Sequence, residues 1–246
     1  MQSTKFNLLF VLIGWLLANA SGQAFTLIPI SATLAPKGYG VATSFRVENE
    51  TSNRVAFQIS MTTREMDELG EETRQSASNF FTIFPPQGVI AAGQRQNVRV
   101  VWKGPQDLTN ELAFRIVAEE LPVNFDPESK ESHIKLLVRY LGTVYIRPKG
   151  VSPKLQTLAL VKAANNSAAT NLYELTLANA GSAHQALKNC QLTVTNSPGQ
   201  TTVIHADDLG TIEGQNLLAH HRRRFAVTLP AALRAPEYHA QLQADE

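Results

Sequence analysis

The residues that could carry out chemistry in this chain are few and scattered. The chain contains six histidines and one cysteine, and the only adjacent histidines are His220 and His221. Neighbouring residues on a strand point to opposite faces, so this pair makes a poor metal site. The sequence also has no G-x-S-x-G elbow, no H-E-x-x-H motif, no phosphate-binding glycine loop and no C-x-x-C pair. We therefore expect no enzyme activity, no metal site and no cofactor.

Charged side chains form two local clusters. Residues 67–72 form an acidic segment, and residues 220–224 form the basic run His-His-Arg-Arg-Arg. The acidic segment is most simply a solvated hairpin, because it offers no paired carboxylates of the glycosidase type. The basic run is most simply a solvated loop or an edge strand guarded against pairing. Its alternative role is contact with an acidic partner.

Composition excludes several classes of protein. The formal net charge of +1 provides no strong field for nucleic acid. Cys190 is the sole cysteine, so no disulfide can form within the chain. A lone thiol in an oxidising compartment is expected to be buried and inert rather than reactive.

The N-terminus has the form of a secretory signal peptide. Lys5 precedes an apolar stretch at residues 8–18, which at about 11 residues is shorter than the ~20 that span a bilayer. Ala18-Asn19-Ala20 offers a cleavage site, so we expect a signal peptide over residues 1–20, with residues 22–24 as a second site. The alternative is an uncleaved anchor.

The elements that must position the polar residues are β-strands. Apolar and polar residues alternate with period two in runs such as Val41–Glu48, Val55–Met61 and Leu112–Val117. Turn residues separate these runs, and seven or so short strands over about 120 residues predict an immunoglobulin-like sandwich. No amphipathic helix of more than a turn or two is convincing.

A break at residues 147–153, rich in proline and glycine, divides the chain. Strand patterns resume after it, for example at Leu155–Leu160 and Leu172–Ala178, although less clearly. We therefore predict an all-β protein with two β-sandwich domains, an N-terminal domain over residues 21–148 and a C-terminal domain over residues 149–246.

One predicted strand, residues 134–141, is apolar on both faces. Ile134, Leu136 and Val138 line one face, and Leu137 and Leu141 contribute to the other. A strand with two apolar faces must bury both, one in its own core and one against a partner. Such a partner could be a protein that lacks a strand. The alternative is that the first three residues simply fill the core of their own domain.

Three ordered segments carry a resemblance to a known family. They are residues 80–100, beginning Phe-Phe-Thr-Ile-Phe-Pro-Pro; residues 111–122, beginning Glu-Leu-Ala-Phe-Arg-Ile; and residues 134–148, ending Tyr-Ile-Arg-Pro. Together they resemble the periplasmic pilus chaperones of the chaperone–usher pathway, and the similarity is looser in the second domain. Ile28-Pro29-Ile30 and Arg139-Tyr140 are more similar to the archaic branch of that family.

The resemblance implies a boomerang of two immunoglobulin-like domains that works in the periplasm. Such proteins bind, fold and cap pilus subunits by donor-strand complementation and deliver them to an outer-membrane usher. By position, the donor residues fall on Ile134, Leu136 and Val138, and burying each could contribute ~1.5–3 kcal/mol. The family also implies that the free chaperone can cap its donor strand by self-association into a homo-oligomer.

The resemblance further assigns an interdomain ion pair to Glu111 and Arg147. These residues occupy positions that set the orientation of the two domains in the family. A third, acidic member of this network would come from the second domain, with Asp207 and Asp208 as candidates.

The subunit anchor departs from the family pattern. Typical members hold the C-terminal carboxylate of the subunit with two basic residues, at places that fall near Thr33 and on Thr143 in this sequence. A carboxylate entering a cleft still favours charge-assisted hydrogen bonds. Arg99 and Arg139 are the predicted anchors, because each interrupts an apolar strand, and Arg115 is a third candidate. For each, the alternative is a solvent-facing arginine.

Two rival functions stay open on sequence alone. One is a secreted two-domain β-sandwich that binds a ligand or surface, which has no need of a strand apolar on both faces. The other is an enzyme built on sandwiches, which requires a paired-carboxylate cleft that the sequence does not show.

Overall fold

The fold is built from strands throughout the part of the chain that is described. The computed structural model describes residues 25–125, 137–164, 171–196, 199–233, 235 and 237–245. The predicted signal peptide and the predicted donor residues Ile134 and Leu136 lie outside these ranges. Within them the helices are short 3₁₀ turns, namely η1 (Gly38–Val41), η2 (Ser78–Phe80), η3 (Ala206–Asp208) and η4 (Gly210–Ile212). No helix among the described residues has the length and apolar character needed to cross a membrane.

The first domain is a sandwich of two sheets. The first sheet has the order β1-β3-β9-β7, with β1 (Phe25–Ile28), β3 (Ala42–Asn49), β9 (Arg95–Trp102) and β7 (Phe81–Phe84). The second has the order β2-β11-β10-β4-β8, with β2 (Ser31–Leu34), β11 (Arg139–Ile146), β10 (Leu112–Glu120), β4 (Val55–Thr63) and β8 (Gln87–Ile90). A separate two-strand hairpin, β5 (Glu65–Met66) with β6 (Glu72–Thr73), follows β4.

The period-two pattern decides which side chains enter the first core. On β9, Val98, Val100 and Trp102 are buried, whereas Arg99 between them is exposed. Trp102 packs with Phe114 at a ring-centroid distance of 5.5 Å, and Phe81 meets both rings edge-on at 5.0–5.2 Å. These aromatic contacts tie the two sheets together.

The second domain contains a six-stranded sheet with the order β16-β15-β19-β12-β13-β18. Its strands are β12 (Leu155–Lys162), β13 (Leu172–Asn179), β15 (Lys188–Thr195), β16 (Thr201–His205), β18 (Arg222–Thr228) and β19 (Glu237–Asp245), and β14 (Gln185–Ala186) pairs separately with β17 (Asn216–Leu217). Tyr173, Leu175 and Leu177 of β13 are completely buried in its core. Cys190 is also buried, and burial beside Glu213 raises the pKa of its thiol to about 12.

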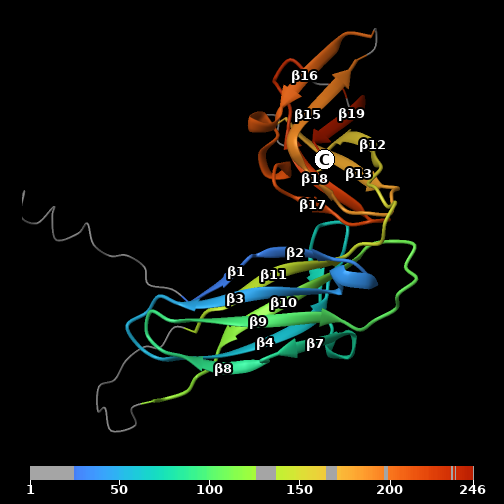
Figure 1. Cartoon of the computed structure of the whole chain (residues 1–246). Helices are drawn as coiled ribbons and strands as arrows, with labels where there is room; N and C mark the ends of the chain where they lie inside the picture. Colours follow the sequence, from blue (N-terminus) through green and yellow to red (C-terminus); the bar gives the residue numbers. More distant parts are fainter. Residues whose placement is uncertain are drawn as a thin grey trace, which may run out of the picture.

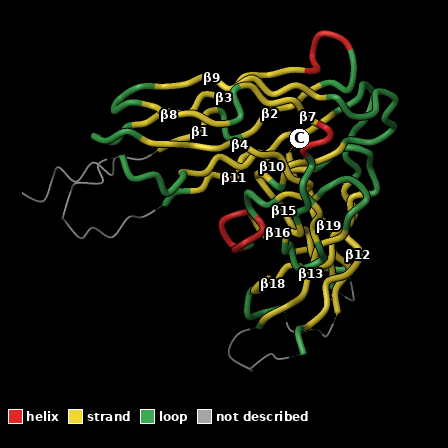
Figure 2. The backbone as a smooth tube through the Cα atoms, turned by 90° about the horizontal axis from the view of Figure 1, so that it is seen from below, coloured by secondary structure: helices red, strands yellow, loops and turns green. Residues whose placement is uncertain are grey.

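The two domains meet at an angle, so the molecule is L-shaped (Figure 1). The chain crosses between them after β11 and before β12, along residues 147–154. The predicted fold class, two immunoglobulin-like β-sandwiches in a boomerang arrangement, is confirmed. The domain boundary after Pro148 stays a prediction and falls within this crossing. In Figure 2 the sheet that contains β10 and β11 lies on the side nearest the second domain.

Candidate functional site in the interdomain cleft

One face of the β10–β11 pair packs into the first core, and the opposite face carries polar residues among its apolar ones. Phe114 and Ile116 of β10, with Val144 of β11, belong to the first core. Alternation then turns Arg115 and Thr143, which are direct partners in the antiparallel register, to the opposite face. This face carries the site.

Two arginines share one glutamate on this face. The Arg115 guanidinium donates to both carboxylate oxygens of Glu72, with Nε–Oε2 at 2.9 Å and Nη2–Oε1 at 2.5 Å. Arg64 Nε donates to the same Oε1 at 2.7 Å. The remaining arms of the two arginines donate to the hydroxyl of Thr143 and, at 3.1 Å, to that of Tyr145. Such charge-assisted, forked contacts are the strongest hydrogen bonds that proteins make.

The charge states follow from these contacts. Burial alone raises the pKa of Glu72, but the hydrogen bonds from Arg115 and Arg64 outweigh it and leave the pKa below its ordinary value of 4.5. Arg223 lies close by, where burial and the charge of Arg64 lower its pKa. Arg64 and Arg115 thus hold the carboxylate of Glu72 directly, and its charge also acts on the neighbouring Arg223.

Glu111 and Arg147 are joined at the domain junction. Arg147 Nε donates to Glu111 Oε2, and the Glu111 side chain is only 2% exposed. His184 of the second domain completes the network: its Nδ1 lies 2.6 Å from Glu111 Oε1 and 3.0 Å from Arg147 Nη2. The third member of the network is thus a histidine. The acidic candidates Asp207 and Asp208 are exposed on η3 instead.

The junction network is reinforced by stacking and by the backbone. Burial raises the pKa of Glu111, but the hydrogen bonds and charge of His184, with the hydrogen bond from Arg147, bring it below its ordinary value of 4.5. The Glu111 amide donates to the carbonyl of Ser182 at 2.8 Å. The ring of Tyr145 stacks on His184, with centroids 3.8 Å apart and planes 8° apart. Tyr145 also packs with Met66 and Leu218 in a small apolar cluster between the domains.

The acidic segment and the basic run meet each other across the cleft. The amide of Arg224 donates to the carbonyl of Glu68 at 2.6 Å, and the two side chains form an ion pair at 3.2 Å. The Arg223 guanidinium lies against Gly70, where a Cβ atom would come within 2.0 Å of Nη2. Residues 67–72 thus lie in a hairpin with Asp67, Glu68 and Glu71 exposed, as predicted, but this hairpin also contacts the second domain. The strand β18, which carries most of the basic run, is an edge strand, and its acidic partner is the first domain itself.

The described end of the predicted donor strand has one open side. Among the described residues, β11 pairs along residues 139–142 with β10 and not with β2, whose parallel pairing begins at Thr143. Val138 is partly buried and packs against the first core. Leu137, on the opposite face, is 46% exposed. Ile134 and Leu136 lie outside the described residues.

The three arginines considered as subunit anchors lie in different parts of the first domain. Arg99 is exposed on the outer face of the other sheet, on β9 between β3 and β7. Arg139 is at the far end of β11 from Tyr145, 64% exposed, and pairs across the strands with Glu119 at 2.7 Å. Of the three candidates, Arg115 is the one that the fold brings to the cleft, beside Thr143.

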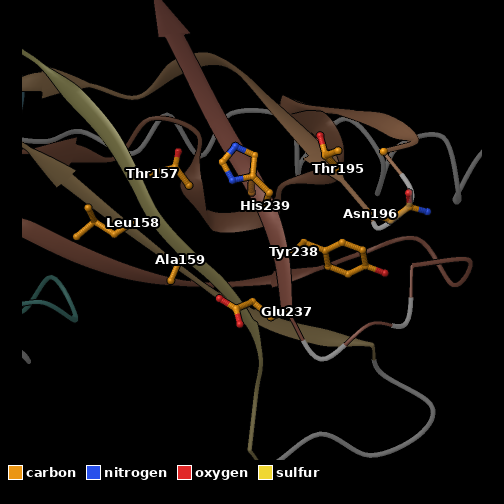
Figure 3. A pocket seen from close by; sticks show the side chains of 10 residues that line it. Thr157, Leu158, Ala159, Thr195, Asn196, Glu237, Tyr238 and His239 are labelled. Atoms are coloured by element: carbon orange, nitrogen blue, oxygen red, sulfur yellow. The ribbon is translucent and has the colours of Figure 1, made fainter.

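A polar hollow of about 790 Å³ in the second domain offers no comparable chemistry. Figure 3 shows Thr157 and Leu158 on one strand and Glu237 and His239 on another, around this hollow. The ladder of β12 with β13 has a bulge at Leu158, and β12 pairs with β19 only through Leu160 and Val161 among the described residues. The Thr157 hydroxyl already accepts the Leu242 amide at 2.8 Å. In the described part of the chain, no group of three or more His, Cys, Asp or Glu side chains is placed to hold a metal ion.

Comparison with known proteins gives a consistent result for the first domain. The family model of the pili and flagellar-assembly chaperone, PapD N-terminal domain, matches residues 34–152. A comparison with curated protein sequences found no match.

Several solved structures share the whole two-domain fold at low sequence identity. The class 5 fimbriae chaperone CfaA is 14% identical with a TM-score of 0.56, covering 91% of this chain and 100% of its own. A chain of the CsuC–CsuE chaperone–tip adhesion subunit complex, from archaic Csu pili of Acinetobacter baumannii, is 18% identical with a TM-score of 0.53, covering 83% and 90%. A chain of the SafA pilin–SafB chaperone complex of Salmonella enterica is 14% identical with a TM-score of 0.54, covering 90% and 96%.

These structures support the fold of both domains, and the family match covers the strands that build the cleft side of the first. The resemblance predicted from the ordered motifs of the sequence is thereby confirmed: residues 34–152 match the family of N-terminal domains of pili and flagellar-assembly chaperones, and the chain shares the fold of solved fimbrial chaperones.

Proposed function

We propose that this chain is a periplasmic chaperone that binds and caps pilus subunits by donor-strand complementation and delivers them to an outer-membrane usher. The observation that carries the proposal is the side of β11 along residues 139–142 that no described strand pairs, at the end of β11 that adjoins the predicted donor residues. An unpaired strand edge presents the backbone groups that a subunit lacking a strand needs. The family match and the chaperone complexes among similar structures support the same reading.

In this proposal Ile134, Leu136 and Val138 are the donor residues. Each apolar side chain that enters a subunit groove contributes ~1.5–3 kcal/mol, so three make capture effective at cellular concentrations. The partial packing of Val138 against the first core leaves the other face of the strand, with the exposed Leu137, as the competing donor.

We further propose that Arg115 anchors the subunit carboxylate, in preference to Arg99 and Arg139. It is the candidate in the cleft, and its guanidinium reaches the hydroxyl of Thr143, at the position where typical family members carry a basic residue. Arg64 adds a second guanidinium within the same network.

The decisive experiment compares the two faces of the strand. The triple variant Ile134→Thr, Leu136→Thr, Val138→Thr keeps β-propensity and removes apolar area. The matched control, Leu137→Thr with Leu141→Thr, changes the opposite face. Each is produced with a pilus subunit encoded in the same gene cluster, and subunit recovered with the chaperone from periplasm is measured.

We expect the triple variant to fold and lose subunit recovery, while the control retains it. Recovery lost only in the control would move the donor role to the Leu137 face. Recovery retained in both would refute donor-strand complementation for this chain. Intact mass of the periplasmic protein tests the signal peptide, because cleavage after Ala20 leaves a chain that begins at Ser21.

A further inference from the structure

We propose that Glu72 is a resident carboxylate that occupies the Arg64–Arg115 pair in the free protein and is displaced by the terminal carboxylate of the subunit. This inference rests on the proposed function of the cleft and concerns how that site is regulated. Glu72 would act as an internal competitor, so that subunit binding is an exchange of one carboxylate for another.

The first observation is the fit of Glu72 to the two guanidinium groups. Its oxygens accept three hydrogen bonds of 2.5–2.9 Å, two from Arg115 and one from Arg64. This is the bidentate geometry by which arginine recognises any carboxylate, including the end of a polypeptide. The arginines therefore already bind the chemical group that they are proposed to receive.

The second observation is a buried arginine beside the network, one of whose N–H groups has no hydrogen-bond partner in the described part of the chain. Arg223 is only 6% exposed, and its Nε has no hydrogen-bond partner among the described residues. Asp67 and Glu72 are the acidic groups whose charge acts on it. Arg223 Nη1 donates to the Gln215 side chain and the Asn216 carbonyl, so its Nε is left to donate to a further acceptor such as a carboxylate.

The third observation is that Glu72 lies on a small hairpin outside the two main sheets of the first domain. Strand β6 pairs only with β5, through Glu65–Thr73 and Met66–Glu72, and belongs to neither main sheet. Withdrawal of Glu72 therefore leaves the ladders of β4, β10 and β11 intact. No covalent bond is made or broken in the exchange, because one carboxylate replaces another. The two arginines therefore face one negative charge before and after it.

Self-competition has a direct functional consequence. A resident carboxylate weakens capture of the external one, because part of the binding free energy is used to displace it. The same feature assists release, since Glu72 returns to the arginines when the subunit departs. The strength of the Glu72 contact thus sets the balance between capture and handover.

The test measures binding of acetate, the simplest carboxylate, to the full mature chain. Titrations follow the Nε–H NMR signals of Arg64 and Arg115, with neutral acetamide as the control ligand. The variant is Glu72→Gln, and its matched control is Glu71→Gln, which makes the same charge change at an exposed position of the same hairpin. If Glu72→Gln fails to fold, Glu72→Asp keeps the charge and only shortens the reach.

We expect acetate to bind Glu72→Gln about tenfold more tightly than wild type, with Glu72→Asp intermediate and Glu71→Gln unchanged. Equal acetate affinity in Glu72→Gln and wild type, or equal binding of acetamide, would overturn the proposal.

Subunit recovery from periplasm separates this inference from the proposed function. Tighter acetate binding together with increased subunit recovery in Glu72→Gln supports both. Tighter acetate binding with subunit recovery that is insensitive to Arg115→Ala would show that the carboxylate exchange is real but that the subunit is not its ligand. That result would refute the anchor role and the subunit part of this proposal.

Discussion

Arg115 and Thr143 face each other across the β10–β11 ladder, and the guanidinium donates to the hydroxyl. A cation supplied by β10 therefore reaches the hydroxyl of Thr143 on β11, the position that the family resemblance assigns to the subunit anchor. The positive charge is retained in the cleft although the residue at that position is neutral.

The first prediction concerns this arrangement. Arg115→Ala should reduce subunit recovery from periplasm by about tenfold or more, because it removes charge-assisted hydrogen bonds to a carboxylate. The double variant Arg99→Ala, Arg139→Ala should recover subunit as wild type does, because both residues are exposed away from the cleft. The reverse order of effects would return the anchor role to Arg99 or Arg139.

The second prediction concerns the domain junction. Glu111→Gln should lower the free energy of unfolding by about 1–3 kcal/mol, because it leaves Arg147 and His184 without the carboxylate that they share. Small-angle scattering should report a wider distribution of interdomain angles. Glu119→Gln, which breaks the exposed Arg139 pair, is the control and should cost ~0–1 kcal/mol. Equal effects of the two variants would contradict an orienting role for the junction.

The third prediction concerns acid. The pKa values of Glu72 and Glu111 are lower in the folded state than their ordinary value of 4.5. Each group therefore contributes stability that is fully present above pH 4.5 and is lost as the pH falls through the folded pKa. Denaturant unfolding measured from pH 7 to pH 3 should show a shallower acid decline in the double variant Glu72→Gln, Glu111→Gln than in wild type. If the free energy of unfolding falls equally with pH in both proteins, Glu72 and Glu111 do not have lowered pKa values in the folded state.

The fourth prediction uses two glycines with similar backbones. Gly70 has φ +91° and faces the Arg223 guanidinium, whereas Gly93 has φ +66° and faces open space. Alanine at either position is strained by the left-handed backbone. Only Gly70→Ala should also displace Arg223, so it should lower the melting temperature more than Gly93→Ala and loosen the interdomain angle. If the two variants lower the melting temperature equally, the contact between Gly70 and Arg223 contributes nothing to stability.

The fifth prediction concerns the thiol. Burial and the nearby Glu213 raise the pKa of Cys190 to about 12, so little thiolate exists at neutral pH. Iodoacetamide at pH 8 should label Cys190 only after denaturation, as followed by intact mass. Labelling of the native protein at the rate of a free thiol would contradict the buried placement.

The sandwich strands could be predicted from sequence because burial on one face imposes a period of two. The contact between residues 67–72 and 220–224 could not, since a charged run has the same local pattern whether it faces water or an opposite charge. Their opposite signs were the only available signal. His184 was missed because the resemblance suggested an acidic third member. The proximity of Arg115 to Thr143 depends on the β10–β11 register, which no local pattern specifies.

The hairpin of β5 and β6 belongs to the first domain in sequence, between β4 and β7, but it contacts the second domain through Arg224. A first domain produced alone, ending at Pro148, would leave Met66 and Tyr145 uncovered and deprive Glu111 of His184. The surface left exposed would combine apolar side chains with an unpaired buried charge. Such a domain should therefore aggregate or bind other proteins. The first domain, which the sequence sets off as a separate unit, therefore depends on the second domain for part of its packing.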